Sequence, residues 1–194
     1  KTISHRFASV AAADKAHALE TLLRREDGKV LIFVNKKLGC ERLGNQLKRA
    51  GLPADSIHGD KGAEARHVCL QAFTRGKVRF LVATDVAARG IDVDDVTLVV
   101  NYDFPLGLED YIHRTGRTGR AGRSGRALSL VAPMERRLYE MVAGHFAGKK
   151  VANAPKAPGR GYGMPKKRSG DGPRGKSRGK PGGRSRSRAA SASS

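Results

Sequence analysis

Short apolar runs of strand length alternate with helical stretches along the first 148 residues, and this alternation restricts the possible folds more than any other feature. A continuous run such as VLIFV at 30–34 is typical of a parallel strand that is covered on both faces. Such an alternation predicts an α/β fold with a doubly wound parallel sheet between helices. The predicted strands are 5–10, 30–34, 56–58, 79–84, 96–102 and 126–132, and the predicted helices are 14–25, 38–50, 63–76, 108–116 and 134–146.

Two glycines support the predicted ends of helices. Gly51 follows the second predicted helix and Gly76 follows the third, where a helix C-cap favours glycine. In a doubly wound sheet, ligands bind the loops at the carboxyl ends of the strands. We therefore expect functional residues after Thr84, after Tyr102 and around His58.

The pattern stops near residue 149. Residues 149–194 contain 14 Lys or Arg against one acidic residue, Asp171, whereas residues 1–148 contain 24 against 17. Because the segment has few large apolar side chains, burial cannot offset the entropy lost on ordering. We predict a folded domain over 1–148 and a disordered tail over 149–194 that binds RNA through its charge. The alternative is a basic linker that keeps the protein soluble.

The two cysteines, Cys40 and Cys69, belong to no CxxC or Cys/His cluster, so neither a disulfide framework nor a metal site is predicted. No apolar run approaches the roughly 20 residues that span a bilayer, and we expect no membrane partner. A reducing intracellular compartment is expected, with nucleus, cytoplasm and organelle left open. The first residue is Lys1 rather than Met, and we expect the chain to be part of a longer protein.

The segment ATDVAARGID at 83–92 begins at a strand end and continues into small residues, so that its backbone could approach a ligand closely. Thr84 offers a hydroxyl and an N–H group of the kind that hold phosphate. Asp92 could accept hydrogen bonds from a ribose, and Asp85 and Arg89 could pair with each other or with nearby loops. Taken alone, the segment is also compatible with an ordinary strand-to-helix turn.

The segment HRTGRTGR at 113–120 concentrates three arginines and a histidine on eight positions. Guanidinium groups suit bidentate capture of phosphate oxygens. Arg117 and Arg120, three residues apart after a predicted helix, have the spacing of arginine fingers that act on a γ-phosphate. The alternative is a solvated basic loop.

A third segment, IHGDKGAEAR at 57–66, joins a strand end to a helix start. Asp60 is a plausible residue for the N-cap region, and the positive end of the helix could meet a backbone phosphate. Arg66, one turn into the helix, could reach the same nucleic-acid strand. The alternative is helix capping beside a surface arginine.

In their order and spacing, ATDVAARGID, VVNYDFP and YIHRTGRTGRAGR resemble the second RecA-like domain of DEAD-box RNA helicases. The run VLIFVN at 30–35 and the segment IHGDKGAEAR stand where that family has further elements. The resemblance covers residues 1–148 and implies a RecA-like parallel sheet between helices. It also implies an ATP-dependent RNA helicase that acts on RNA rather than DNA.

The resemblance implies roles for individual residues. Arg117 and Arg120 would be arginine fingers on the γ-phosphate when two helicase domains close. The remaining assignments are Asp92, His113 and Gly90 for ATP and the domain interface; Asn35, Gly59, Arg66 and Thr84 for the RNA backbone; and Asp85, Arg89 and Arg114 for bracing the loops. Ala63 stands where the family usually has glutamine, and this puts one contact in the RNA-side loop in doubt.

No G-x-x-x-x-G-K-[ST] phosphate loop and no D-E-A-D stretch occurs in the 194 residues. In the family, both lie on the first RecA-like domain. We therefore expect that the cofactors are ATP and Mg²⁺, with Mg²⁺ held by that N-terminal domain, and that this chain alone has negligible ATPase activity. The expected partners are RNA and that domain. The alternatives are a stand-alone, non-catalytic RNA-binding or annealing module and a superfamily 2 DNA helicase.

Overall fold

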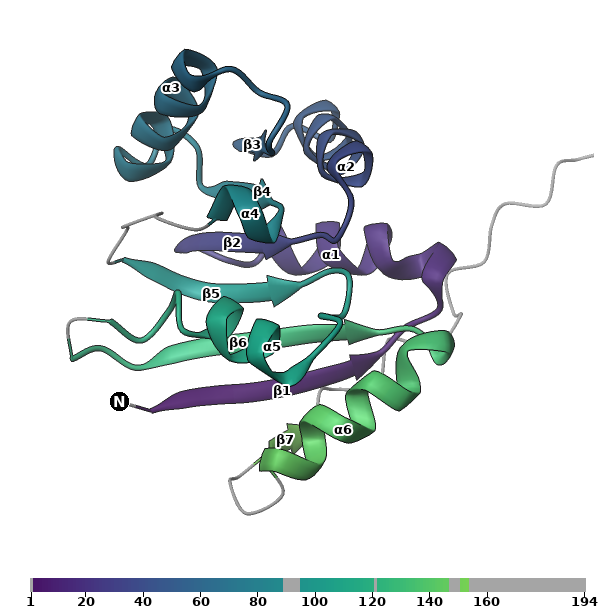
Figure 1. Ribbon diagram of the computed structural model, residues 1–194. Helices are drawn as coiled ribbons and strands as arrows, with labels where there is room; N and C mark the ends of the chain where they lie inside the picture. The colour runs from purple at the N-terminus through teal and green to yellow at the C-terminus, as the bar shows by residue number, and fades with distance from the viewer. Residues whose placement is uncertain (1, 89–94, 121, 147–150, 154–194) are drawn as a thin grey trace, which may run out of the picture. The chain divides into compact units, whose positions relative to one another are not determined.

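The computed structural model describes residues 2–88, 95–120, 122–146 and 151–153, the last range by its backbone alone. The chain divides into two units, 1–159 and 160–194, and all described residues belong to the first unit. Their strands form one parallel sheet in the order β3-β4-β2-β5-β6-β1-β7 (Figure 1). The strands are β1 (Ile3–Ser9), β2 (Lys29–Phe33), β3 (Ala54–Ile57), β4 (Phe80–Ala83), β5 (Val96–Asn101), β6 (Gly125–Val131) and β7 (Val151–Asn153).

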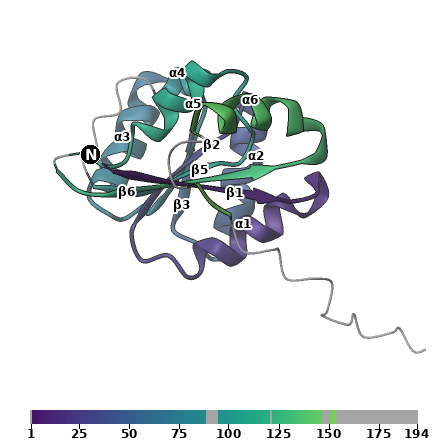
Figure 2. The ribbon, with the colours of Figure 1, turned by 90° about the horizontal axis from the view of Figure 1, so that it is seen from below.

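Helices cover both faces of this sheet. The helices α1 (Lys15–Leu23) and α2 (Lys37–Arg49) pack on one face, and α1 lies opposite α4, α5 and α6 in Figure 2. The other face carries α3 (Ala63–Thr74), α4 (Asp85–Ala88), α5 (Leu108–Thr115) and α6 (Arg136–Phe146). Single 3-10 turns, Ala12–Asp14 and Pro133–Glu135, precede α1 and α6. No helix in the described ranges is long and apolar enough to cross a membrane.

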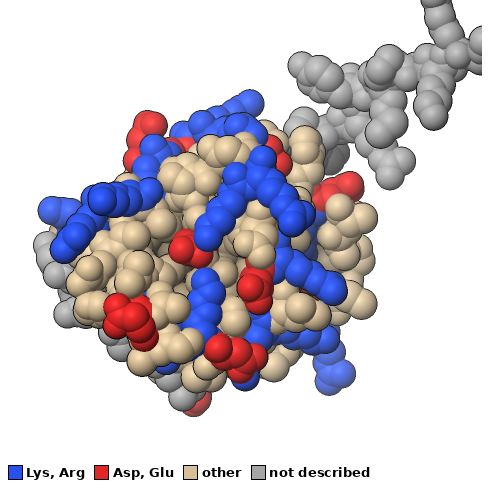
Figure 3. All heavy atoms as spheres, turned by 90° about the horizontal axis from the view of Figure 1, so that it is seen from above, with Lys and Arg blue, Asp and Glu red and all other residues tan. Residues whose placement is uncertain are grey.

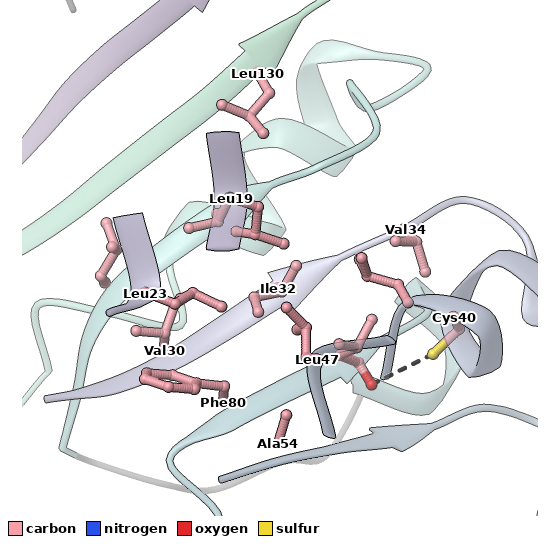
Figure 4. Packing of buried hydrophobic residues seen from close by; sticks show 14 of the residues in the cluster. Leu19, Leu23, Val30, Ile32, Val34, Cys40, Leu47, Ala54, Phe80 and Leu130 are labelled. Carbon is pink, nitrogen blue, oxygen red and sulfur yellow. Dashed lines mark hydrogen bonds between the residues drawn. The ribbon is translucent and has the colours of Figure 1, made fainter. Parts of the chain in front are cut away.

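The strand β2 shows why a parallel sheet forms here. Val30 and Ile32 point to the face of α1 and α2, where they pack in one cluster with Leu19 and Leu23, and Val34, just after the strand, belongs to the same cluster near Cys40 (Figure 4). The intervening Leu31 and Phe33 are buried in the opposite core, under α3 and α4. Successive side chains of a strand point to opposite faces, so a run that is apolar at every position requires helices on both sides.

The edge strand β3 and the helix α2 approach each other closely because of one glycine. A Cβ atom on Gly44 of α2 would lie 2.8 Å from the Cβ of Ser56 in β3. Two other glycines end helices, as predicted: Gly51 after α2 has φ 77° and Gly76 after α3 has φ 75°. These conformations are strained for any residue with a side chain.

The predicted fold class is confirmed, and all six predicted strands and all five predicted helices are present with shifted ends. Among the described residues, one α-helix and one strand were not predicted. The helix α4 has four residues, which is too short for a 3.6-residue period to be visible. The strand β7 lies inside the segment predicted as tail, and it forms where Val151–Asn153 pairs with the edge strand β1. Residues 149–150 and 154–194, the rest of the predicted disordered tail, lie outside the described residues.

Candidate functional site

The described residues of the three segments 57–66, 83–92 and 113–120 lie toward one edge of the sheet. The strands run in the same direction, so their carboxyl ends meet along that edge (Figure 1). Asn35 follows β2, His58 follows β3, Thr84 follows β4 and Asp103 follows β5. The helix α5 brings His113 and Arg114 to the same edge.

Arg114 is the centre of this edge, with only 2% of its surface exposed. Its guanidinium binds Asp85 through two hydrogen bonds, from Nε to Oδ1 (2.6 Å) and from Nη2 to Oδ2 (2.7 Å). The remaining N–H groups donate to the Asp103 carbonyl (2.8 Å), the Asn35 Oδ1 (2.7 Å) and the Asn101 Oδ1 (3.4 Å). The group also lies 5.1 Å from the centre of the Phe33 ring. All five guanidinium donors are thus used, which makes Arg114 a brace between β2, α4, β5 and α5.

Asn35 is part of the same brace. Its N–H donates to the Asp103 carboxylate (2.9 Å), and its side-chain Nδ2 donates to the Phe104 carbonyl (3.1 Å). Its Oδ1 accepts from Arg114. The amide and the N–H of Asn35 are therefore engaged within the protein, and contact with RNA through this residue remains a prediction. Asp85 pairs with Arg114. Its predicted partner Arg89 lies outside the described residues, together with Gly90 and Asp92.

A pocket of about 250 Å³ opens between α4 and α5. Arg114 and Asp85 form one wall as a neutral pair, whereas His113, Arg117 and Asp110 contribute further charged or titratable groups. The full lining is Phe33, Asp85, Ala88, Asp110, His113, Arg114 and Arg117. A half-buried arginine beside a histidine can hold an anionic oxygen through charge-assisted hydrogen bonds. Asp110 was missed in the sequence, although its place three residues before His113 on one helix face was a usable signal.

The two predicted fingers are not equivalent in this structure. Arg117 lines the pocket, and Arg120 is not among the lining residues. Its Nε donates to the Gly116 carbonyl at 3.4 Å, and both arginines contact other residues. The loop that carries them is anchored at Thr118, whose hydroxyl donates to the Val96 carbonyl at 2.5 Å, and at Gly119, whose φ of 70° favours glycine.

The segment predicted to face RNA lies between β3 and α3. Gly62 is the N-cap of α3, and no side chain caps this helix, so Asp60 lies in the N-cap region without acting as a cap. Asp60 instead forms an ion pair with Lys37 at 2.5 Å, and the Lys37 hydrogen bond lowers the pKa of that carboxyl. The side chain of Lys37 also covers Gly59, with its Cε 3.5 Å from the position of a Cβ there. Lys37 was missed because only the tertiary structure brings the start of α2 to this loop.

Thr84 and Arg66 flank the same loop. Thr84 is buried, and its N–H donates to the Ile57 carbonyl at 3.3 Å, which ties β4 to the end of β3. The Nε of Arg66 is buried and has no hydrogen-bond partner among the described residues. Lys and Arg side chains are scattered over the face that Figure 3 shows, with several acidic groups among them. An arginine with an unpaired, buried N–H on such a face is suited to an added anion.

Comparisons with known proteins agree with this geometry. The helicase conserved C-terminal domain family matches residues 14–122. The DEAD-box ATP-dependent RNA helicase 30 of Arabidopsis thaliana is 41% identical over 162 residues, which cover 79% of this chain and 27% of that protein. The ATP-dependent RNA helicase DbpA of Bacillus subtilis is 44% identical over 138 residues, which cover 71% of this chain and 29% of that protein. The chain therefore spans less than a third of the length of these two relatives.

Solved structures match over a larger share of their chains. The E. coli DEAD-box protein SrmB, crystallised with the regulator of ribonuclease activity A, superimposes with a TM-score of 0.72 and 34% identity. This match covers 81% of the present chain and 92% of the SrmB chain. The C-terminal domain of the DEAD-box protein Dbp5 gives a TM-score of 0.70 with 32% identity, over 78% of this chain and 89% of that domain.

Proposed function

We infer the function from one premise: the chain belongs to the helicase conserved C-terminal domain family and is the second RecA-like domain of a DEAD-box helicase. We propose that it binds RNA and, with an N-terminal RecA-like domain, couples ATP hydrolysis to local unwinding of RNA duplexes. The observation that carries the proposal is the pocket between α4 and α5, where Arg117 and His113 stand beside the fully bonded Arg114.

The residues of this pocket fit one end of a nucleotide better than a whole nucleotide. Its volume of about 250 Å³ and its half-buried Arg117 suit a terminal phosphate that a second domain presents. No three His, Cys, Asp or Glu side chains gather as a metal site in the described ranges. We propose that Mg²⁺ is held by the N-terminal domain, where it would neutralise phosphate charge.

In the proposed reaction, ATP and RNA bind between the two domains and closure brings Arg117 and Arg120 onto the γ-phosphate. Charge develops on the phosphate oxygens in the transition state, and guanidinium groups stabilise it. His113 lies on the same helix as Arg114 and would join the domain interface. The brace around Arg114 would hold α5 in place, so that Arg117 needs little reorganisation during closure.

Substitution of Arg117 tests the catalytic part of this proposal. In a two-domain protein that joins this chain to a DEAD-box N-terminal domain, we expect Arg117→Ala to lower ATP turnover by roughly 10³-fold or more. RNA affinity should change less than about twofold, because Arg117 is assigned to phosphate of ATP. Arg137→Ala on the exposed surface of α6 is the matched control and should retain wild-type turnover. Equal turnover in the two variants would contradict the assignment.

Two rival functions make different predictions. A stand-alone RNA-binding or annealing module, which the basic residues 154–194 favour, would bind RNA equally well in Arg117→Ala and would need no ATP. A DNA helicase of the same superfamily would prefer DNA duplexes in a competition assay. Unwinding of an RNA duplex that DNA duplexes fail to inhibit, together with its loss in Arg117→Ala, would exclude both rivals.

A further inference from the structure

His58 is a buried histidine that the proposed reaction does not use. It directly follows β3, and the alternation along that strand turns Ala54, Ser56 and His58 toward α2, while Ile57 points to the core under α3. The residue is 5% exposed. Both ring nitrogens are buried, and neither has a hydrogen-bond partner among the residues that the structure describes. Such a pair of unsatisfied buried atoms is rare in folded proteins.

A carboxylate lies near the ring, at a distance too long for a hydrogen bond. It belongs to Glu41 of α2, whose Oε2 lies 3.7 Å from Nε2 and whose side chain is 54% exposed. Asp60, two residues after His58, forms an ion pair with Lys37 of α2. Lys61 donates to a backbone carbonyl of β3 at 2.6 Å. The Cys40 thiol of α2 stays neutral, because burial raises its pKa to about 12.

The protonation state of the His58 ring determines which hydrogen bonds it can form in this environment. A neutral ring has one donor and one acceptor, and here both are unsatisfied. A protonated ring has two donors, and the half-exposed Glu41 is free to move the short distance that a charge-assisted hydrogen bond requires. The positive charge of Lys37, which lies over Gly59, disfavours protonation of the ring. The ion pair of Lys37 with Asp60 offsets this effect. An anion added beside Lys37 would therefore favour protonation of the ring.

We propose that His58 takes up one proton from solvent when an RNA phosphate binds to the adjacent segment Gly59–Lys61, so that RNA affinity rises as the pH falls. The inference rests on the proposed function, which assigns the RNA backbone to Gly59 and Arg66. The RNA-bound protein then holds more protons than the free protein, and the affinity increases wherever that difference exists. His58 acts as a positioning residue: its protonated ring bonds Glu41 and holds the loop against α2.

The test is the pH dependence of RNA binding by the full 194-residue chain. A short single-stranded oligouridine is the probe, and its Kd is measured between about pH 6 and pH 8 at constant ionic strength, where unperturbed His changes charge. Residues 149–194 contain no histidine, so binding by that segment does not vary over this range. We expect affinity to rise roughly three- to tenfold from the upper to the lower pH, as linkage to one titrating group allows.

Variants and NMR assign the effect to one ring. In His58→Gln the pH dependence should disappear, whereas His67→Gln, at an exposed site on α3, should retain it. Glu41→Gln changes an exposed side chain and keeps the fold intact, and it should reduce the pH dependence of RNA affinity. The Cε1–H resonance of His58 should titrate at a higher pH in the presence of oligouridine, while that of His67 should not move.

Three results would overturn the inference. A pH dependence that persists unchanged in His58→Gln would assign it to another group. An identical His58 titration with and without RNA would show that its proton is not linked to binding. If oligouridine shifts no backbone amide near Gly59 or Arg66 while it still binds the chain, the RNA assignment of the proposed function fails, and this inference fails with it.

Discussion

At the scale of single residues, Arg114 shows how one buried charge is made compatible with a protein interior. A buried ion pair costs desolvation that only good geometry and additional hydrogen bonds repay. Arg114 meets that condition through its two bonds to Asp85 and its three bonds to Asn35, Asn101 and Asp103. The same bonds fix the start of the loop that carries Arg117.

Arg114→Ala is therefore expected to destabilise the fold by about 3 kcal/mol, the lower end of the range for broken buried pairs, because Asp85 keeps 34% exposure. Urea unfolding followed by circular dichroism measures the change. Arg136→Ala removes an arginine–glutamate pair of similar length at 79% exposure, where solvent screens the charges, and should leave the free energy of unfolding nearly unchanged. Similar losses in the two variants would contradict the role of Arg114 as a brace.

At the scale of elements, the contact of α2 with the edge strand β3 depends on the absence of a side chain at Gly44. The edge strand also protects its own outer polar groups. The Ser56 N–H donates to the Asp55 carboxylate at 2.7 Å, and the Ser56 carbonyl accepts from Lys61 at 2.6 Å. Because these backbone groups already have hydrogen-bond partners, the short edge strand is a poor template for pairing with another chain.

Two glycines of the same helix offer a matched pair of substitutions. Gly44→Ala should cost about 1–3 kcal/mol, because the added methyl group would overlap Ser56 and push α2 away from β3. Gly39→Ala meets no atom within 4 Å and should stabilise the fold by about 0.5–1 kcal/mol through helix propensity. Thermal unfolding of both variants measures the difference, and a stabilising Gly44→Ala would refute the close approach.

At the scale of the whole molecule, charge is divided unevenly between the described domain and the segment that follows it. Residues 154–194 contain 12 Lys or Arg against one Asp, a net charge of +11 out of +20. Contacts between such a segment and phosphates release counterions, so affinity falls steeply with salt and carries little sequence information.

Replacement of residues 154–194 by a Gly/Ser segment of equal length should lower RNA affinity at low salt by about tenfold or more and flatten the salt dependence. The equal length separates the effect of charge from that of a linker, and filter binding over a salt series measures both. If the salt dependence of RNA affinity stays unchanged, the segment is better explained as a solubilising linker. The replacement begins at 154 because β7 reaches Asn153.

Much of the fold was predictable because its signals are local. Apolar runs such as 30–34 required burial on both faces, and Gly51 and Gly76 ended helices through their own backbone preference. The motif segments were predictable for the same reason, since each is contiguous in the chain. The sequence by itself thus determined the α/β class, the order of elements and the edge of the sheet where the site lies.

Only the tertiary structure decided which side chains meet at that edge. Arg114 bonds Asn35 across 79 positions and Asp85 across 29, and Lys37 reaches Asp60 across 23. Such pairings depend on strand order and on how far each strand extends, which no local pattern encodes. The same holds for β7, whose three residues become a strand because β1 has a free edge. Local preferences determined the elements of this protein, and the packing of distant strands determined its site.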